Sequence, residues 1–158
     1  MITLKPQPLT AEAFAPYGHV VVMPADPRRI YFGELIENRR PGVPLGLSYS
    51  VMQGVELPCR LTLFERHEFS AQAFLPMNAT RYLVTVCPDT GTGRPDPSRA
   101  IAFLAAPDQG IVYGANVWHH PMTCLTPRGE FTVVMWANND AQDEELVPLE
   151  FDMQVGAA

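Results

Sequence analysis

Cysteine is scarce in this sequence of 158 residues, which contains only Cys59, Cys87 and Cys124. Their number is odd and their spacing is wide, so the sequence has no Cys-x-x-Cys pair for zinc binding or redox chemistry. Each cysteine lies beside apolar or β-type residues. We interpret all three as buried free thiols in a reducing cytoplasm, and their spacing gives no support to a catalytic cysteine.

Long apolar runs and an excess of positive charge are also lacking. No segment is long enough to span a bilayer, and Met1–Pro6 lacks the charged leader and apolar run of a secretory signal. The 11 Lys and Arg residues are outnumbered by 17 Asp and Glu residues, which gives a net charge of −6. This balance offers no basic patch for a phosphate backbone. We expect a cytoplasmic protein with a small polar substrate, and neither a membrane nor a nucleic acid as a partner.

Proline and glycine are plentiful, with 16 and 11 residues respectively, and they imply many turns and few long helices. The length fits one domain, residues 1–158, that can bury a core without disulfides or metals. Short strands separated by Gly- and Pro-containing turns favour an all-β fold, an antiparallel barrel or sandwich.

One short helix is expected near the start of the chain, with Thr10 as its N-cap and Leu9 packed on Phe14. An acidic run, Asn138–Glu145, is typical of a solvated surface. Alternation and β-propensity predict these strands: His19–Met23, Ile30–Glu37 with an interruption at Gly33, Leu47–Gln53, Cys59–His67, Gln72–Leu75, Arg81–Cys87, Arg99–Ala105, Ile111–Tyr113 with a continuation towards Pro121, and Glu130–Trp136.

The strand Cys59–His67 ends in side chains that can carry chemistry. With a period of two, Leu61 and Leu63 share one face with Glu65 and His67. If the leucines point into a core, the carboxylate approaches that core and needs a partner or a metal. The alternative is an exposed strand end with solvated side chains, on which Arg66 makes a surface ion pair of little energetic value.

A second segment, Gly110–Pro121, places His119 and His120 next to each other on a strand. Neighbouring residues on a strand face opposite ways, so only one of these rings faces the interior on regular geometry. A lone histidine on a strand is commonly a hydrogen-bonded core residue. In the same segment Asn116 tolerates a left-handed turn conformation, and we expect Trp118 in the core.

The turn Asn38–Gly42 contains a pair of arginines, Arg39 and Arg40. Such a pair usually lies in solvent at the tip of a turn. The alternative is an anion-reading part of a substrate pocket, because arginine matches a carboxylate with two parallel hydrogen bonds.

Taken together, the two segments resemble the two metal-binding motifs of the cupin superfamily. By that resemblance Glu65 takes the place of the first histidine, His67 that of the second, Gln72 that of the carboxylate and His119 that of the last histidine. The resemblance implies a cupin-like antiparallel β-barrel, or jelly roll, with these four residues around a metal ion.

More narrowly, Glu65–His67 with Gln72–Met77 and Asn116–Pro121 resembles the ureidoglycolate lyase family, and Leu9–Phe14 with Tyr17–Gly18 is similar as well. The resemblance covers nearly the whole chain. It implies a cytosolic enzyme of purine nitrogen recovery that splits (S)-ureidoglycolate into glyoxylate and urea. It also implies a homodimer and a divalent metal such as Ni²⁺, with Zn²⁺ and Mn²⁺ as alternatives.

The reaction requires removal of the substrate hydroxyl proton and protonation of the departing urea nitrogen. We assign catalytic roles to Glu65, His119 and His120; Glu65 is either a metal ligand or the base. The proton donor to urea is left open among His120, Tyr113 and a water molecule.

We expect Arg66, Tyr113 and Asn116 to bind substrate. Alternation places Arg66 opposite His67, so it reaches substrate only at a bulge or across a dimer interface. Two other interpretations remain: a non-catalytic cupin that binds a small carboxylate or sugar, and a metal-free barrel in which Glu65 and His67 form an internal hydrogen-bonded pair.

Overall fold

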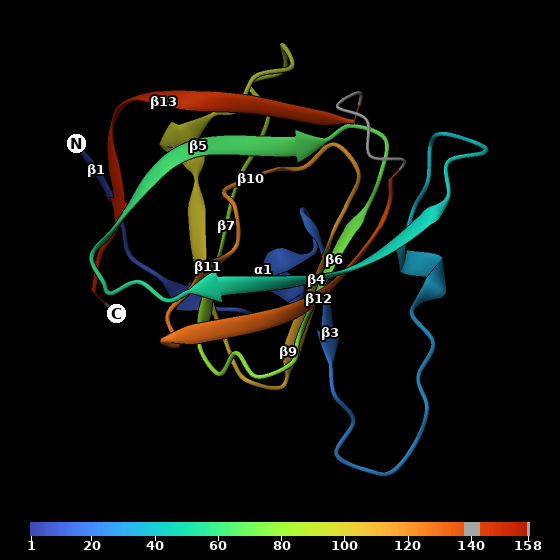
Figure 1. Ribbon diagram of the computed structural model, residues 1–158. Coiled ribbons are helices and arrows are strands. Elements are labelled where there is room, and N and C mark those ends of the chain that lie inside the picture. Colours follow the sequence, from blue (N-terminus) through green and yellow to red (C-terminus); the bar gives the residue numbers. More distant parts are fainter. Residues whose placement is uncertain (138–142, 158) are drawn as a thin grey trace.

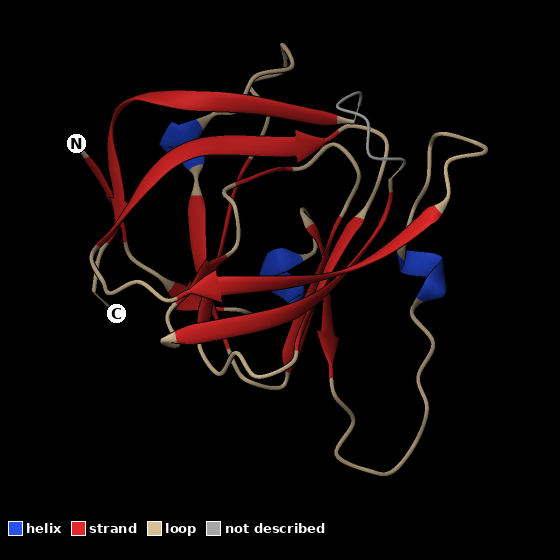
Figure 2. Cartoon of the chain, viewed as in Figure 1, coloured by secondary structure: helices blue, strands red, loops and turns tan. Residues whose placement is uncertain are grey.

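Strands dominate the computed structural model, which describes residues 1–137 and 143–157 (Figure 1, Figure 2). The strands form two sheets that curl around a shared interior, as expected for a mainly-β, cupin-like fold. No helix in the described part of the chain is long and apolar enough to cross a membrane. The elements, in chain order, are β1 (Ile2–Leu4), β2 (Gln7–Pro8), α1 (Ala11–Phe14), β3 (Gly18–Val22), the 3₁₀ turn η1 (Gly33–Leu35), β4 (Leu45–Gln53), β5 (Cys59–His67), β6 (Gln72–Pro76), β7 (Tyr82–Cys87), the 3₁₀ turn η2 (Pro97–Arg99), β8 (Ile101–Ala105), β9 (Gln109–Tyr113), β10 (Trp118–His119), β11 (Thr123–Cys124), β12 (Arg128–Trp136) and β13 (Glu144–Val155).

The larger sheet has the order β1-β13-β5-β10-β7-β8-β2, with β11 paired to β7. The smaller sheet has the order β3-β9-β6-β12-β4. Most neighbouring strands are antiparallel, and among the described strands only β1 with β13 and β2 with β8 are parallel pairs. The main apolar core lies between the sheets, because it combines residues of both; its largest members are Phe14, Phe74, Tyr82, Phe103, Tyr113 and Phe131.

The short N-terminal helix is confirmed. The hydroxyl of Thr10 accepts a hydrogen bond from the Ala13 backbone N–H at 3.1 Å, as an N-cap residue should. Leu9 and Phe14 are both buried in the core between the sheets. The helix therefore closes one side of the core.

Most of the predicted strands are confirmed to within two residues at their N-terminal ends, and Cys59–His67 agrees at both ends. The strand expected over Ile30–Glu37 is wrong, because only the turn η1 forms there. Phe32, Leu35 and Ile36 instead pack over the outer face of the smaller sheet. Their spacing of three and four residues suits a helical turn better than a strand.

The final strand, β13, was not predicted. Its alternation is broken at Pro148, and its register with β5 shifts between Pro148 and Met153. The acidic run Asn138–Glu145 lies partly outside the described residues. Within the described part, Asp143 is buried and not solvated, because it accepts a hydrogen bond from the Phe69 backbone N–H at 2.7 Å and lies 3.2 Å from the Arg40 guanidinium.

Candidate active site

Two strands that are far apart in sequence, β5 and β10, lie side by side in the larger sheet. Glu65 and His119 are directly paired across them. Directly paired residues of antiparallel strands point to the same face, so these two side chains share the face that looks into the interior. His67 follows two residues after Glu65 and points the same way.

The three side chains converge on one point. The nitrogen or oxygen atoms that Glu65, His67 and His119 can offer to a metal all lie within 4.8 Å of one another. His119 Nε2 is 3.2 Å from Glu65 Oε1, and the two imidazole rings have centroids 5.9 Å apart. Two nitrogen donors and one carboxylate at this spacing suit a divalent transition metal.

Burial makes this cluster unusual. His67 is 7% exposed and His119 is 1% exposed, while the Glu65 side chain keeps 16% of its surface accessible. His67 Nδ1 and His119 Nε2 are buried without a hydrogen-bond partner among the described residues, because the short contact between His119 and Glu65 lacks hydrogen-bond geometry. Buried polar atoms normally have partners. The two unpaired nitrogens therefore fit a bound metal ion.

The orientation of His119 is fixed by its surroundings. Its Nδ1 lies 2.9 Å from the Val117 carbonyl oxygen, so Nδ1–H donates there and Nε2 carries the lone pair. The Tyr113 ring stacks on the imidazole, with centroids 4.0 Å apart and planes 15° from parallel. A histidine held through one nitrogen by a carbonyl group presents the other nitrogen to a metal in a defined direction.

The ionisation of the cluster also favours metal binding. Burial works to raise the pKa of Glu65, but the contact with His119 and the charges of His119 and His67 outweigh it, and the pKa lies below its ordinary value. Burial lowers the pKa of His67, and the nearby His119 lowers it further. At neutral pH the carboxylate is therefore charged and the His67 imidazole is neutral, the forms that coordinate a metal.

The smaller sheet contributes Gln72 and Tyr113, which are directly paired on β6 and β9. Their side chains share a face, and Tyr113 reaches His119, so Gln72 faces the same interior. Gln72 Nε2 lies 3.5 Å from the sulfur of Met135, whereas its Oε1 is buried without a partner in the part of the chain that the structure describes. The Tyr113 hydroxyl is also buried and unpaired, and burial raises its pKa well above the ordinary value.

His120 and Asn116 lie outside the cluster. His120 Nδ1 is 2.8 Å from the Pro121 carbonyl oxygen, and its ring lines a separate surface hollow. Asn116 has a positive φ of 70°, the left-handed turn conformation expected for it, and its side chain is exposed. Its backbone N–H donates to the His67 carbonyl at 2.6 Å, so Asn116 helps to hold His67 through the main chain.

Arg39, Arg40 and Arg66, the three arginines considered as substrate-binding residues, lie in different environments. Arg66 lies against Trp118, with the guanidinium 4.5 Å from the ring centroid, on the face opposite His67. Arg39 is an exposed residue paired with Glu37. Arg40 is largely buried, donates to the Trp136 carbonyl at 3.3 Å and pairs with Asp143, so the two adjacent arginines do not form one solvated tip.

The alternation expected along β5 does not hold over its whole length. Leu61 lies in the same apolar cluster as Phe64, which regular alternation would place on the other face. The register between β5 and β13 shifts between Leu61 and Leu63, and this irregularity interrupts the alternation. The inward direction of Glu65 and His67 therefore depends on their pairing with β10 and β13, and not on the leucines before them.

Sequence reasoning missed Asp143. Its carboxylate and carbonyl groups accept hydrogen bonds from the backbone of Phe69 and Glu68, just after His67, and its charge acts on His67. An aspartate within an acidic run gives no local signal of such a role, because only the fold brings β13 beside the end of β5.

Comparison with known proteins points to one enzyme family. The family model described as ureidoglycolate lyase matches residues 1–156. A protein of Brucella abortus named ureidoglycolate lyase is 36% identical over 152 residues, covering 90% of this chain and 88% of its own length. A protein of Mesorhizobium japonicum with the same name is 36% identical over 154 residues, covering 92% and 93% of the two chains.

Proposed function

The chain belongs to the ureidoglycolate lyase family, and we propose that Glu65, His67 and His119 form its active site, where (S)-ureidoglycolate is split into glyoxylate and urea. One observation carries this proposal: three potential metal ligands from two strands converge within 4.8 Å, with buried nitrogens that have no hydrogen-bond partner within residues 1–137 and 143–157. Family membership gives the class of reaction, and the cluster is where we propose that the reaction occurs.

The substrate itself limits the chemistry that is needed. Ureidoglycolate carries a hydroxyl group and a urea nitrogen on the same carbon. Loss of the hydroxyl proton forms the carbonyl group of glyoxylate, the carbon–nitrogen bond breaks, and the departing nitrogen takes its electron pair and a proton. No external nucleophile is required, so the enzyme needs a base, a proton source and a means to make the hydroxyl group more acidic.

We propose that Glu65, His67 and His119 hold a divalent metal, with Gln72 Oε1 as a fourth ligand. The fit rests on the unpaired His67 Nδ1, His119 Nε2 and Gln72 Oε1 atoms. Mixed nitrogen and oxygen donors suit Ni²⁺, our first choice, as well as Zn²⁺ and Mn²⁺. A metal bound there would polarise the substrate hydroxyl group and lower its pKa.

Proton transfer and substrate binding fall to residues in and around the cluster. In the alternative arrangement, in which His67, His119 and Gln72 alone hold the metal, Glu65 is the base that accepts the hydroxyl proton, since it is charged at neutral pH and retains some accessible surface. Tyr113 stays protonated because burial raises its pKa, and its unpaired hydroxyl group donates a hydrogen bond to substrate. We favour Tyr113 or a water molecule over His120 as the proton source, since His120 already bonds the Pro121 carbonyl group.

We also propose that the enzyme is a homodimer. β4 is an edge strand of the smaller sheet, and its outer face carries four exposed apolar side chains at alternate positions: Leu45, Leu47, Tyr49 and Val51. Met77 is exposed as well, and the neighbouring Thr132 hydroxyl donates to its sulfur. A contiguous apolar patch of this kind is typical of a surface that is covered by another subunit.

Replacing Leu47, which is 75% exposed, by glutamate should convert the dimer into monomers, because a charge would be buried in the contact. Size-exclusion chromatography with light scattering measures the mass. Phe151→Glu, a change on the larger sheet, is the matched control and should leave the dimer intact. A Leu47→Glu protein with the wild-type mass would contradict this interface.

Two broader assignments complete the proposal. We propose a cytoplasmic location, supported by Cys59, Cys87 and Cys124, which are all buried and free. We further propose that residues 1–158 form one domain. In support, both sheets combine strands from distant parts of the chain, and the core between them includes the N-terminal helix.

The experiment that tests the function is incubation of the purified protein with (S)-ureidoglycolate, with glyoxylate and urea measured in the same sample. Lyase chemistry predicts equal amounts of the two products and no ammonia. Release of ammonia in place of urea would indicate hydrolysis of the amide, and absence of both products would contradict the proposed function.

A further inference from the structure

The strand that carries His119 is held by few backbone contacts. β10 has only two residues, pairs with β5 at His119 alone and pairs with β7 at both of its positions. So short a strand has few ladder hydrogen bonds, although the flanking Asn116 and His120 N–H groups bond the carbonyl groups of His67 and Thr85. The position of His119 therefore also depends on side chains packed behind β10.

Those side chains lie on the back of the site. Glu65, His67 and His119 point to the interior, so their neighbours Arg66 and Trp118 point to the opposite face of the same sheet. There the Arg66 guanidinium lies over the Trp118 ring at 4.5 Å from its centroid. One residue from each ligand-bearing strand thus meets directly behind the three ligands.

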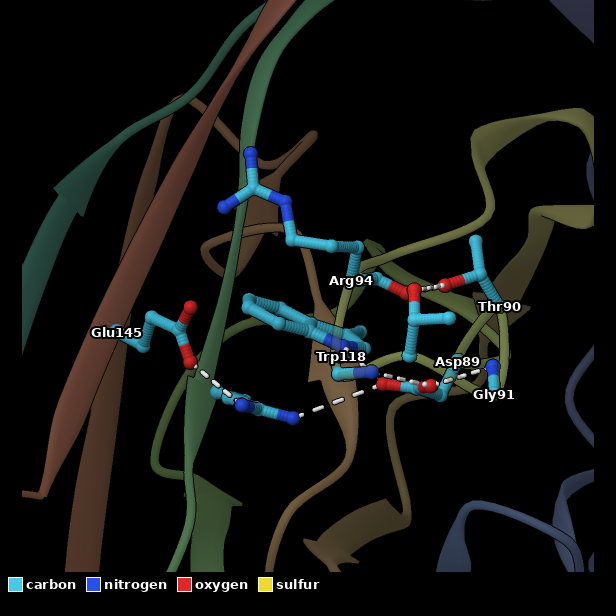
Figure 3. Close-up of polar contacts among 9 residues, drawn as sticks. Asp89, Thr90, Gly91, Arg94, Trp118 and Glu145 are labelled. Atoms are coloured by element: carbon cyan, nitrogen blue, oxygen red, sulfur yellow. Dashed lines mark hydrogen bonds and ion pairs between the residues drawn. The ribbon is translucent and has the colours of Figure 1, made fainter.

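Two carboxylates tie this contact to the rest of the sheet. Arg66 Nη2 and Nε lie 2.6 Å and 2.9 Å from Glu145 Oε2 on β13, and Arg66 Nη1 lies 3.6 Å from Asp89 Oδ2. The Trp118 indole N–H donates to the same Asp89 oxygen at 3.2 Å. Figure 3 shows Trp118 between Glu145 and Asp89. We refer to Arg66, Asp89, Trp118 and Glu145 as the rear cluster.

The loop after β7 is fixed to the rear cluster as well. Asp89 Oδ1 accepts hydrogen bonds from the backbone N–H groups of Gly91 at 2.6 Å and Gly93 at 3.0 Å, and the first of these is visible in Figure 3. Asp89 therefore uses both of its oxygens to connect the loop with Trp118 and Arg66. The rear cluster joins β13, β5, β10 and this loop.

Burial separates this arginine from an ordinary surface ion pair. The Arg66 side chain is 12% exposed and the Trp118 residue is 1% exposed. Arg60, on the same strand, also pairs with a carboxylate of β13, Asp152, but both side chains are about 70% exposed. An arginine that is stacked on an aromatic ring and shielded from water contributes more than such an exposed pair.

We propose that Arg66 and Trp118 are positioning residues that hold β5 and β10 in the arrangement in which Glu65, His67 and His119 converge on a metal. This inference rests on the metal site of the proposed function. It gives Arg66 a role through its neighbours and not through contact with substrate. Groups behind the ligands of a metal site commonly change metal affinity without touching the ion.

The test compares Arg66→Met, which keeps an apolar side chain of similar length without the charge, with Arg60→Met as the matched control. Co²⁺ serves as the probe, and its affinity is measured by competition with a chromophoric chelator. Arg66→Met should weaken Co²⁺ binding by about 10- to 100-fold and alter the visible absorption of the bound ion. Arg60→Met should bind within about twofold of wild type, since its exposed pair is remote from the ligands.

A milder variant provides a second test in case Arg66→Met does not fold. Trp118→Phe keeps an aromatic ring under Arg66 but removes the N–H that donates to Asp89, and it should weaken Co²⁺ binding by several-fold. Wild-type affinity and absorption in a folded Arg66→Met protein, or in Trp118→Phe if Arg66→Met does not fold, would overturn the positioning role alone. Failure of the wild-type protein to bind Co²⁺ would overturn both this inference and the proposed metal site.

Discussion

Replacement of His119 by alanine should reduce turnover of (S)-ureidoglycolate by at least about 100-fold, because the cluster loses a metal ligand and the partner of Glu65. The fold should survive. The lost ring leaves a cavity beside Tyr113, at a cost of about 2 kcal/mol, which is a fraction of the stability of a domain of this size. Steady-state kinetics and circular dichroism on the same preparation measure both effects.

His120→Ala is the matched control, since it removes the same kind of side chain one residue later, just past the end of β10 and outside the cluster. It should reduce turnover far less than His119→Ala. His119→Gln fills most of the space of the ring and separates the loss of the ligand from the loss of packing. Equal losses at the two positions would indicate an irregular strand, and an unaffected His119→Ala enzyme would refute the site.

Glu65→Gln has the second largest expected effect. Glutamine keeps the shape and one oxygen atom but removes the charge and the basicity of the carboxylate, so turnover should fall by about 100-fold or more. Metal content, measured on the same protein, separates the two roles of Glu65. If Glu65 is a ligand, metal affinity and turnover fall together; if it is only the base, the metal is retained while turnover falls.

Glu68→Gln controls for the loss of one negative charge at the end of the same strand, because Glu68 is exposed. It should leave turnover within about twofold of wild type. Full activity of both Glu65→Gln and Glu68→Gln would show that Glu65 has no role in the mechanism. The proposed site would then lack its carboxylate.

Much of the fold follows from local sequence. Cys59–His67 and Glu130–Trp136 have the β-branched, aromatic and alternating residues of strands, and both form strands. Thr10 predicts its helix through a local hydrogen bond. Three of the four predicted ligands, Glu65, His67 and His119, are brought together because β10 pairs with β5 at His119 and Glu65.

The rest of the fold and of the site depends on contacts between residues distant in sequence, which no local pattern reveals. β13 was missed because Pro148 and the register shift hide its alternation, although it supplies Glu145 to the rear cluster and Asp143 directly precedes it beside the site. The segment around Phe32 contains apolar residues, but their packing against the outer face of the smaller sheet depends on strands that are distant in the sequence. Arg40 and Asp143 pair across about a hundred residues for the same reason.

The most direct test of metal-assisted cleavage at Glu65, His67 and His119 is the release of glyoxylate and urea from (S)-ureidoglycolate by wild-type protein as purified, after chelation, and after Ni²⁺ or Mn²⁺ is added back. We predict equal release of both products, its loss on chelation and its recovery with metal. Undiminished release by protein shown to be free of metal would contradict metal assistance at Glu65, His67 and His119, and the acid and base residues alone would then have to carry the reaction.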